Sequence, residues 1–422
     1  MIPLIAAWYD FDPFRELYDW LRDNTWDELV YVVIAVVGAT GILSFVGLGA
    51  LANVWLERRI IGRIQVRRGP NRVGPFGLFQ PVADAIKLIQ KEVLQPSASD
   101  AKLYNLPPIL VFIPAMLTFA VFAWAPDMVY ADLNVGVLYL LALSSITSLA
   151  IFMAGWASNN KYALLGAMRV IAMAISYEIP LVMALLAPVL FAGTMSIPGL
   201  IDFQKEHDIW LAFLLPLPVF IYAIAATAEL NRTPADIAEA ESEIVAGFHT
   251  EYSGMKFGLF YAVELINSLA VSGIMASLFF GGYSLFGIEE YIPPWIIFIG
   301  KIYFFYFGLI WLRGTWPRLR IDQLMAFAWK MLIPLALINV VIVAIEVLLW
   351  RELELTDWVL AAYVAINAVL AIGLFAFFFR IITRDYYRLP RRVRLEHDVS
   401  VPSLPAPPSL ALSQPGTGVG EA

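Results

Sequence analysis

Long apolar runs alternate with short charged segments along most of the chain. The first run, 29–56, contains 28 residues without a charged side chain. A helix needs about 20 apolar residues to cross the hydrocarbon core of a bilayer, so such a run is long enough to span a membrane. Further spans are predicted at 104–126, 134–157, 170–193, 209–229, 257–280, 292–312, 331–350 and 358–380. The pattern predicts an all-α polytopic membrane protein with about nine transmembrane helices.

The segments outside the spans divide the chain further. Residues 1–28 predict an N-terminal amphipathic extension, 29–382 the transmembrane domain, and 383–422 a largely disordered, Pro-rich tail. Apolar residues at helical spacing within 80–94 predict an amphipathic surface helix in the first long loop, 57–103. Prolines inside or near the spans predict a kinked bundle: Pro114, Pro180, Pro188, Pro216, Pro218 and Pro334.

Composition supports the membrane assignment and narrows the chemistry. Of the 422 residues, 60% are hydrophobic and 15% are charged. Soluble domains carry about 25% charged residues, so a water-soluble fold is excluded. The chain has no cysteine, which excludes disulfides, thiolate metal sites and Fe–S ligation by this chain. Its three histidines lie far apart and form no metal-ligand spacing.

The distribution of Lys and Arg predicts the orientation. With the loop after the first span in the cytoplasm, cytoplasmic segments hold 23 Lys and Arg residues and the opposite side holds 4. Lys and Arg are retained on the cytoplasmic side of membrane proteins. We therefore expect the N-terminus outside, the C-terminus in the cytoplasm, and the long loops 57–103 and 230–256 on the cytoplasmic side.

Four glutamates fall within or at the cytoplasmic ends of predicted spans: Glu57, Glu178, Glu229 and Glu264. A charge at the centre of a membrane helix costs about 2.5–3.5 kcal/mol on insertion scales, so such residues usually have a role. Their graded depths in the inner half of the bilayer predict a proton or ion path. The alternative is that each is a structural group hydrogen-bonded to a neighbouring helix. Glu346, near the outer end of its span, is expected to reach the interface.

The second long loop is rich in carboxylates. Asp236, Glu239 and Glu243 recur at helical spacing, Glu241 points elsewhere, and Arg232 precedes Asp236 by four residues. We expect a short helix with one carboxylate face and an Arg232–Asp236 pair. The opposite apolar face would comprise Ile237, Ala240, Ile244, Val245 and Phe248. Clustered carboxylates cannot all ionise freely, so the loop is expected to exchange protons near neutral pH. A solvated acidic loop is the alternative.

A basic cluster follows the first span. It comprises Arg58, Arg59, Arg63, Arg67, Arg68 and Arg72. One interpretation is anchoring to lipid head groups on the cytoplasmic side. The other is docking of a partner, or the lining of a site together with Asp84.

Four sequence stretches carry a resemblance. They are ERRIIGRIQVRRGPNRVGPFGLFQPVADAIKLIQKE (57–92), GAMRVIAMAISYEIPL (166–181), ELNRTPADIAEAESEIVAGFHTEYSGMKFGLFYAVE (229–264) and RGTWPRLRIDQLM (313–325). Together they resemble the H-type membrane subunit of bacterial proton-pumping NADH:quinone oxidoreductase, respiratory complex I. The resemblance covers about residues 29–350. The N-terminal extension, the ninth span and the tail lie outside it.

The resemblance implies a multi-pass subunit of the bacterial cell membrane, located where the peripheral redox arm meets the membrane arm. It implies a quinone cavity shared with peripheral subunits, small and antiporter-like membrane subunits as neighbours, and contact with lipids. Quinone is then the substrate. No redox cofactor is expected on this chain, since FMN and the Fe–S clusters belong to partner subunits. No nucleic-acid partner is expected.

The family's functional positions carry over onto residues of this sequence. The quinone-cavity residues implied are Glu57, Arg58, Asp84, Arg232 and Phe248. The coupling and proton-path residues implied are Glu178, Glu229, Asp236, Glu239, Glu241, Glu243 and Glu264. No residue of this chain alone is implied to be catalytic. One departure is Ile237-Ala238, which stands where the family pattern has a proline before the acidic triplet.

Two other functions compete with this one. A related subunit of a membrane-bound proton-pumping hydrogenase would share the glutamates without requiring quinone. A stand-alone proton-coupled transporter would show inverted repeats and broken-helix sites, and neither pattern is evident in the sequence. The choice between ubiquinone and menaquinone stays open.

Overall fold

The computed structural model describes residues 27–126, 128–237, 245–352 and 357–387. The predicted N-terminal extension and Pro-rich tail lie almost entirely outside these residues. Contacts divide the chain into two units, Met1–Ile382 and Thr383–Ala422. The account below concerns the first unit, which contains nearly all described residues.

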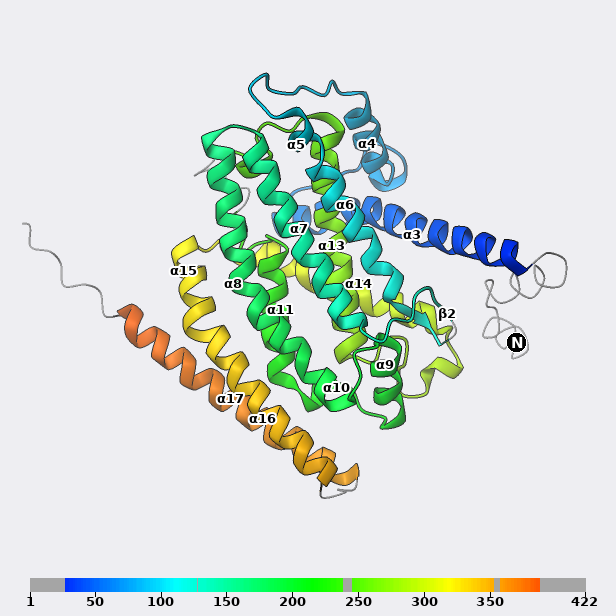
Figure 1. The fold of residues 1–422 in the computed structure, drawn as a ribbon, viewed down its shortest axis with the longest axis vertical. Helices are drawn as coiled ribbons and strands as arrows, with labels where there is room; N and C mark the ends of the chain where they lie inside the picture. The colour runs from blue at the N-terminus through cyan, green and yellow to red at the C-terminus, as the bar shows by residue number, and fades with distance from the viewer. Residues whose placement is uncertain (1–26, 127, 238–244, 353–356, 388–422) are drawn as a thin grey trace, which may run out of the picture. The chain divides into compact units, whose positions relative to one another are not determined.

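Helices dominate the described residues and confirm the all-α class (Figure 1). Eight helical segments among these residues are long and apolar enough to cross a membrane. They are built from α3 (Asp27–Ile64); α5 (Ala101–Asn105), α6 (Pro107–Leu117) and η2 (Thr118–Val121); α7 (Gly136–Ala157); α8 (Lys161–Ala192); α13 (Gly254–Phe279); α14 (Pro294–Thr315); α15 (Ile321–Phe327), η5 (Ala328–Leu332) and α16 (Ile333–Glu352); and α17 (Asp357–Tyr387). Several run beyond the predicted spans, because polar residues at helix ends still continue the backbone hydrogen bonds.

The predicted span 209–229 is a broken helix in the structure. It consists of α10 (Leu211–Leu214) and α11 (Pro216–Glu229), separated by the non-helical Leu215. Pro218 has no N–H to donate to the Leu214 carbonyl, so the helix loses a hydrogen bond here. The Asn367 side-chain amide of α17 donates to that carbonyl instead, at 2.9 Å. The break shortens the continuous helix to 14 residues.

Short elements connect the spans. The first long loop contains η1 (Pro75–Gly77) and α4 (Gln80–Gln90), and α4 confirms the predicted amphipathic helix. The remaining elements are β1 (Ala123–Ala125), β2 (Met128–Val129), α9 (Ile197–Glu206), η3 (Gly247–His249) and η4 (Ile288–Glu290). The strands β1 and β2 form an antiparallel pair, with Ala123 opposite Val129 and Ala125 opposite Met128.

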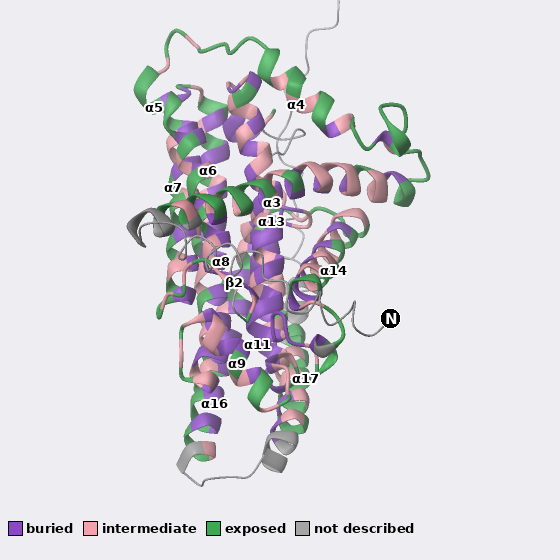
Figure 2. Cartoon of the chain, turned by 90° about the vertical axis from the view of Figure 1, so that its right-hand side faces the viewer, coloured by how far each residue is buried: buried purple, intermediate pink, exposed green. Residues whose placement is uncertain are grey.

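The core lies along α13 and α8 (Figure 2). In α13, 72% of the most apolar window is buried, whereas the corresponding window of α17 is 11% buried. The helix α13 packs against α14, α6, α3 and α4, and α8 packs against α7, α11 and α16. Residues on α13 are thus placed where several spans meet.

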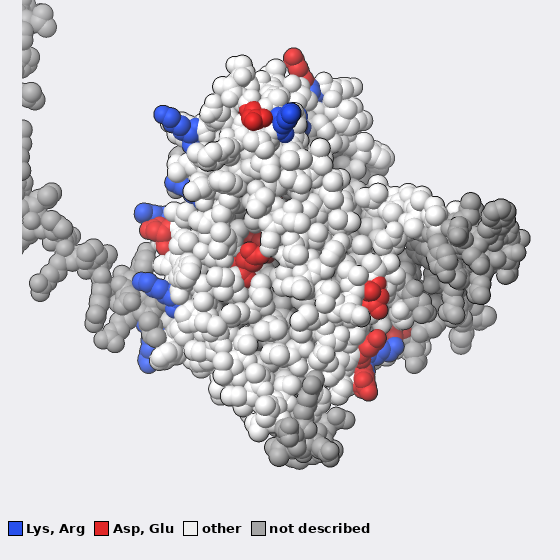
Figure 3. All heavy atoms as spheres, viewed as in Figure 1, with Lys and Arg blue, Asp and Glu red and all other residues white. Residues whose placement is uncertain are grey.

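The face in Figure 3 carries few charged side chains over the spanning helices. The exposed residues of these helices are mostly large and apolar, among them Leu138, Leu149, Phe213 and Leu348. Such a surface is expected where a helix bundle contacts lipid.

Candidate functional site: a buried ion cluster beside a polar cavity

Two oppositely charged side chains are buried where the first span meets the loop after α11. Glu57 on α3 is 3% exposed and Arg232 is 2% exposed. Arg232 Nη2 lies 3.3 Å from Glu57 Oε2. The buried stripe of α3 that carries Glu57 also includes Val46, Ala50 and Asn53. This helical spacing turns Glu57 inward although it stands at the polar end of the span.

Two further side chains complete an ion cluster, defined here as Glu57, Arg232, Glu264 and Arg313. Arg232 Nε donates to Glu264 Oε1 on α13 at 3.1 Å. Arg313 at the end of α14 donates to Glu57, and its Nη1 lies 3.8 Å from Glu264 Oε1. Two carboxylates thus face two guanidinium groups, which balances the charge of the cluster. Breaking one buried pair would leave an uncompensated charge.

The electrostatics of Arg232 follow from its surroundings. Burial disfavours its charged form, but the carboxylates of Glu264 and Glu57 outweigh that effect and raise the pKa of Arg232 above its ordinary value. Arg232 is therefore a fixed cation.

The predicted Arg232–Asp236 pair is replaced by these longer-range pairs. Among the described residues, the ion pairs of Arg232 run to Glu57 and Glu264. Asp236 is half-buried, its Oδ1 has no hydrogen-bond partner there, and its charge acts on Glu264. Two buried carboxylates attract a guanidinium more strongly than one carboxylate four residues away in the loop.

The carboxylate helix predicted for this loop falls mainly on 238–244, and Glu239, Glu241 and Glu243 lie outside the described residues. The apolar repeat expected after them is absent from the described residues 245–249. Val245 has φ +60° and is exposed, whereas Phe248 is buried in η3. Phe248 packs edge-on against Phe260 of α13, with ring centroids 5.3 Å apart.

His249 follows Phe248 and is also buried. Burial lowers the pKa of His249 to about 4 from an ordinary value of 6.5. His249 is therefore neutral at physiological pH, and its ring packs 5.3 Å from Phe257.

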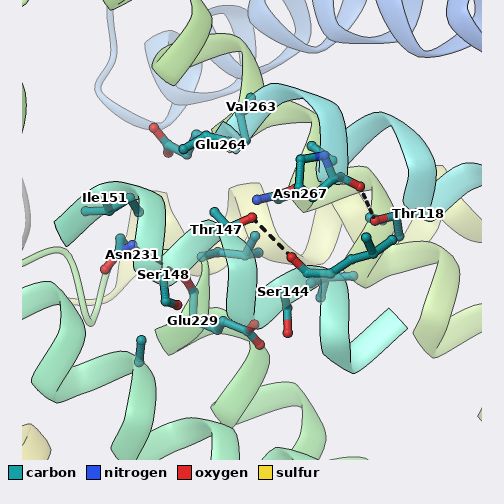
Figure 4. A pocket seen from close by; sticks show the side chains of 18 of the residues that line it. Thr118, Ser144, Thr147, Ser148, Ile151, Glu229, Asn231, Val263, Glu264 and Asn267 are labelled. Atoms are coloured by element: carbon teal, nitrogen blue, oxygen red, sulfur yellow. Dashed lines mark hydrogen bonds between the residues drawn. The ribbon is translucent and has the colours of Figure 1, made fainter. Parts of the chain in front are cut away.

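A cavity of about 130 Å³ adjoins the ion cluster (Figure 4). Its wall is mostly apolar, and we call it the polar cavity after the Glu, Asn, Ser and Thr side chains that face into it. Glu264 and Glu229 both line it, as do Phe248 and His249. Its uncharged polar lining includes Thr118, Ser144, Thr147, Ser148, Asn231 and Asn267. One water needs roughly 10–15 Å³ of such a volume, so the cavity has room for several waters. Glu264 thus belongs both to the ion cluster and to the wall of a space that reaches Glu229.

Glu178 and Glu229 form a second carboxylate pair, on the adjacent helices α8 and α11. Their charges act on each other, and Ser144 of α7 interacts with Glu229. Ser145, also on α7, donates to Glu178. Among the described residues these contacts are to hydroxyl groups, and no arginine or lysine ion pair reaches either carboxylate.

Arg58 and Asp84 lie apart from the ion cluster. Arg58 Nη1 donates to Asp84 Oδ2 at 2.6 Å and joins α3 to α4, with side chains 48% and 28% exposed. Partial burial opposes ionisation of Asp84, but hydrogen bonds from Arg58 and Gln80 prevail and lower its pKa. Of the five residues expected at a quinone cavity, the structure joins Glu57 to Arg232 and Arg58 to Asp84, and only Phe248 lines the polar cavity.

Several members of the site were not anticipated from the sequence. Arg313 and Tyr306 lie on one face of α14, where Tyr306 is buried beside Arg232. Ser144 of α7 and Asn267 of α13 line the cavity, and the exposed Ser145 contacts Glu178. Polar residues at helical spacing within apolar runs were the available signal. Among the described residues, no group of three His, Asp or Glu side chains is arranged to hold a metal ion.

Known proteins are similar to this chain over a range that includes all the residues of the site. A family model described as NADH dehydrogenase matches residues 37–344. The H-type subunit of NADH-quinone oxidoreductase from Dehalococcoides mccartyi is 50% identical over 352 residues, covering 83% of this chain and 94% of that protein. The corresponding protein of Carboxydothermus hydrogenoformans is 42% identical, covering 81% and 97%. That of Geobacillus kaustophilus is 48% identical, covering 72% and 90%.

Proposed function

The chain belongs to the NADH dehydrogenase family as an H-type subunit of NADH-quinone oxidoreductase, and from that premise we propose that its ion cluster and polar cavity couple quinone reduction to proton movement. It is a membrane subunit of a translocase. The observation that carries the proposal is the double role of Glu264. Its carboxylate pairs with Arg232 and also lines the cavity that reaches Glu229.

We assign the ion cluster to the quinone side of this coupling. Glu57 and Arg232 of the cluster are implied at the quinone cavity, together with Arg58, Asp84 and Phe248. They do not enclose a quinone-sized pocket by themselves. This favours a cavity completed by a peripheral subunit, whose redox cofactors would deliver the electrons. Reduction of the quinone consumes protons and changes the charge near Glu57 and Arg232.

The balanced cluster then relays that change. If Glu57 or the loop carboxylate Asp236 takes up a proton, Arg232 is held less strongly on that side. Its attraction to Glu264 changes in response, because both carboxylates share the same guanidinium group. Glu264 passes the change to the polar cavity, and Glu229 and Glu178 receive it on the other side. Glu239, Glu241 and Glu243 are proposed to supply protons from the loop.

The test replaces Glu264 or Glu178 by Gln in the intact enzyme. We expect quinone-coupled proton pumping to fall, while NADH oxidation by artificial acceptors stays unchanged because the redox arm is untouched. Glu346→Gln serves as the matched control, since this buried glutamate pairs with Asn367 between α16 and α17, away from the cluster. Normal pumping in both Glu264→Gln and Glu178→Gln would reject the proposal.

We also propose the N-terminus outside and the C-terminus in the cytoplasm, on the strength of the Lys and Arg distribution. The cluster would then lie toward the cytoplasmic side, where peripheral subunits dock. Cysteine residues introduced at Arg72 and Asp208 test this, because the native chain has none. A membrane-impermeant thiol reagent added to intact cells is expected to label the cysteine at 208 and spare that at 72. The reverse pattern would invert the orientation.

A further inference from the structure

Buried polar atoms without hydrogen-bond partners are concentrated at the ion cluster. Nine such side-chain atoms occur in the described part of the chain. Eight of them belong to Asn53, Glu57, Asn231, Arg232, Asp236 and Tyr306. Buried polar groups nearly always have partners, and an exception points to an ordered water or ion. Two of these residues, Asn53 and Tyr306, have no place in the coupling path proposed above.

Asn53 is the most completely buried of these polar residues. Its side chain is on α3, one turn before Glu57 and on the same face, and the residue is 0% exposed. Both its amide oxygen and its amide nitrogen lack partners. Leaving a buried donor or acceptor unpaired is destabilising, so the amide requires a polar neighbour.

Tyr306 lies at a neighbouring level of the same helix interface. A Cβ at Gly49 of α3 would lie 3.9 Å from the Tyr303 hydroxyl of α14, and Glu57 of α3 accepts from Arg313 of α14. Position 53 falls between these two contacts, as does position 306. Tyr306 is 1% exposed, and its hydroxyl interacts with Arg232, but the hydroxyl has no well-aligned hydrogen-bond partner among the described residues.

We propose that Asn53 and Tyr306 hold at least one ordered water against the Glu57–Arg232 pair. An amide and a hydroxyl can each donate to and accept from a water, whereas carboxylate and guanidinium groups offer only one of the two roles. The water supplies hydrogen bonds to Glu57 Oε2 and to the Nη atoms of Arg232, which have none from the described residues. Asn53 and Tyr306 are thus positioning residues for the ion cluster.

The inference rests on the proposed function for its consequence, though not for its geometry. A water that donates to Glu57 keeps Arg232 divided between Glu57 and Glu264. Losing the water changes how strongly each carboxylate holds Arg232. The pH profile of quinone-coupled turnover is then expected to change.

A structure of the intact enzyme that resolves waters tests the site directly. We expect density within hydrogen-bond distance of the Asn53 amide and the Tyr306 hydroxyl. In Asn53→Leu that density is expected to vanish, because leucine fills the volume without a polar group. A dry interface in the unsubstituted enzyme, or a lipid or partner side chain in that position, would overturn the inference.

Turnover measured against pH tests the positioning role. Asn53→Leu and Tyr306→Phe are each expected to change the pH profile, and the double variant should change it no further than the larger single effect, since both hold the same water. Asn53→Ser, which keeps a hydroxyl and leaves room for water, should restore the profile. Asn339→Leu removes another buried amide, on α16, and should leave the profile unchanged.

These results separate the inference from the proposed function. An unshifted profile in both Asn53→Leu and Tyr306→Phe would reject the positioning role. If Asn53→Leu fails to assemble, Asn53→Ser and the water density decide the question. If Glu264→Gln pumps normally while the water density is present, the proposed coupling fails and the water site stands.

Discussion

The ion cluster and the Glu178–Glu229 pair differ in the side chains that contact their carboxylates inside the helix bundle. Glu57 and Glu264 are held by Arg232 and Arg313, whose guanidinium groups can only donate hydrogen bonds. Such partners hold the two carboxylates in place through charge and hydrogen bonds.

Glu178 and Glu229 interact instead with the hydroxyl groups of Ser145 and Ser144. A hydroxyl donates to a carboxylate and accepts from a carboxylic acid, so it accommodates both protonation states. The two regions are therefore suited to different tasks. On the function proposed above, the cluster would transmit charge through its geometry. The hydroxyl groups beside Glu178 and Glu229 can keep their contacts in either protonation state of the carboxylates.

The largest expected effect comes from removing the central cation of the cluster. Arg232→Met leaves Glu57 and Glu264 with only Arg313 between them, and breaking a buried pair costs about 3–5 kcal/mol. We expect poor assembly of the enzyme in the membrane, measured by native electrophoresis and by NADH–quinone activity. Adding Glu57→Gln should restore part of the assembly, because it removes one uncompensated charge. Full assembly of Arg232→Met alone would contradict the paired-charge account.

A smaller effect is expected from Glu229→Gln, since a neutral amide keeps partners among the hydroxyl groups. The enzyme should assemble normally. Quinone-coupled pumping should fall on the order of tenfold, which corresponds to an increase of about 1.4 kcal/mol in activation free energy. Pumping is measured as proton uptake by reconstituted vesicles, with artificial-acceptor activity as the control. If pumping is unchanged, Glu229 does not carry the proton, and the proposed task of the Glu178–Glu229 pair is rejected.

A still smaller effect is expected from removing the hydroxyl group that contacts Glu178. Ser145→Ala deletes the donor to Glu178, and a hydrogen bond of this kind contributes about 1 kcal/mol. Pumping should fall a few-fold with its pH dependence altered, while assembly is unaffected. Ser158→Ala is the matched control, because this serine of the segment after α7 donates to its own helix at Ala154. An equal loss in Ser158→Ala would mean that helix packing, and not the carboxylate contact, accounts for the effect.

The smallest effect is expected at the Arg58–Asp84 pair. Because its pKa is lowered in the folded state, Asp84 contributes stability that is present above its ordinary value of 3.8 and is lost as the pH falls through the folded value. Exposed pairs contribute roughly 0–1 kcal/mol, so Arg58→Met should only slightly increase amide exchange in α4 at neutral pH. A large increase would make this pair part of the structural core.

Much of the fold follows from local properties of the sequence. Apolar length predicted the spans, and the spacing within 80–94 predicted α4. Pro216 and Pro218 signal a disturbance of the helix near Leu215, but the sequence predicts a kink there and the structure has a break. The carboxylates Glu57, Glu178, Glu229 and Glu264 stood out because a charge in an apolar run is rare.

The pairing of those charges did not follow from the sequence. Arg232 has a local candidate in Asp236, yet it pairs with Glu264, 32 residues away, and with Glu57 on another span. Spacing rules describe neighbours on one helix, whereas these contacts depend on how α3, α13 and α14 pack. The positions of Asn53 and Tyr306 could not be predicted for the same reason. An uncharged polar residue is informative only when its surroundings are known.

The ion cluster has a consequence for how the chain is made. Glu57 stands at the end of the first described span, and its partner Arg313 follows 256 residues later. The cluster is therefore complete only after α14 has been made, long after the first span. We expect a chain that ends before Arg313 to be degraded faster than one that includes α14. A pulse–chase comparison of the two truncations would measure this difference.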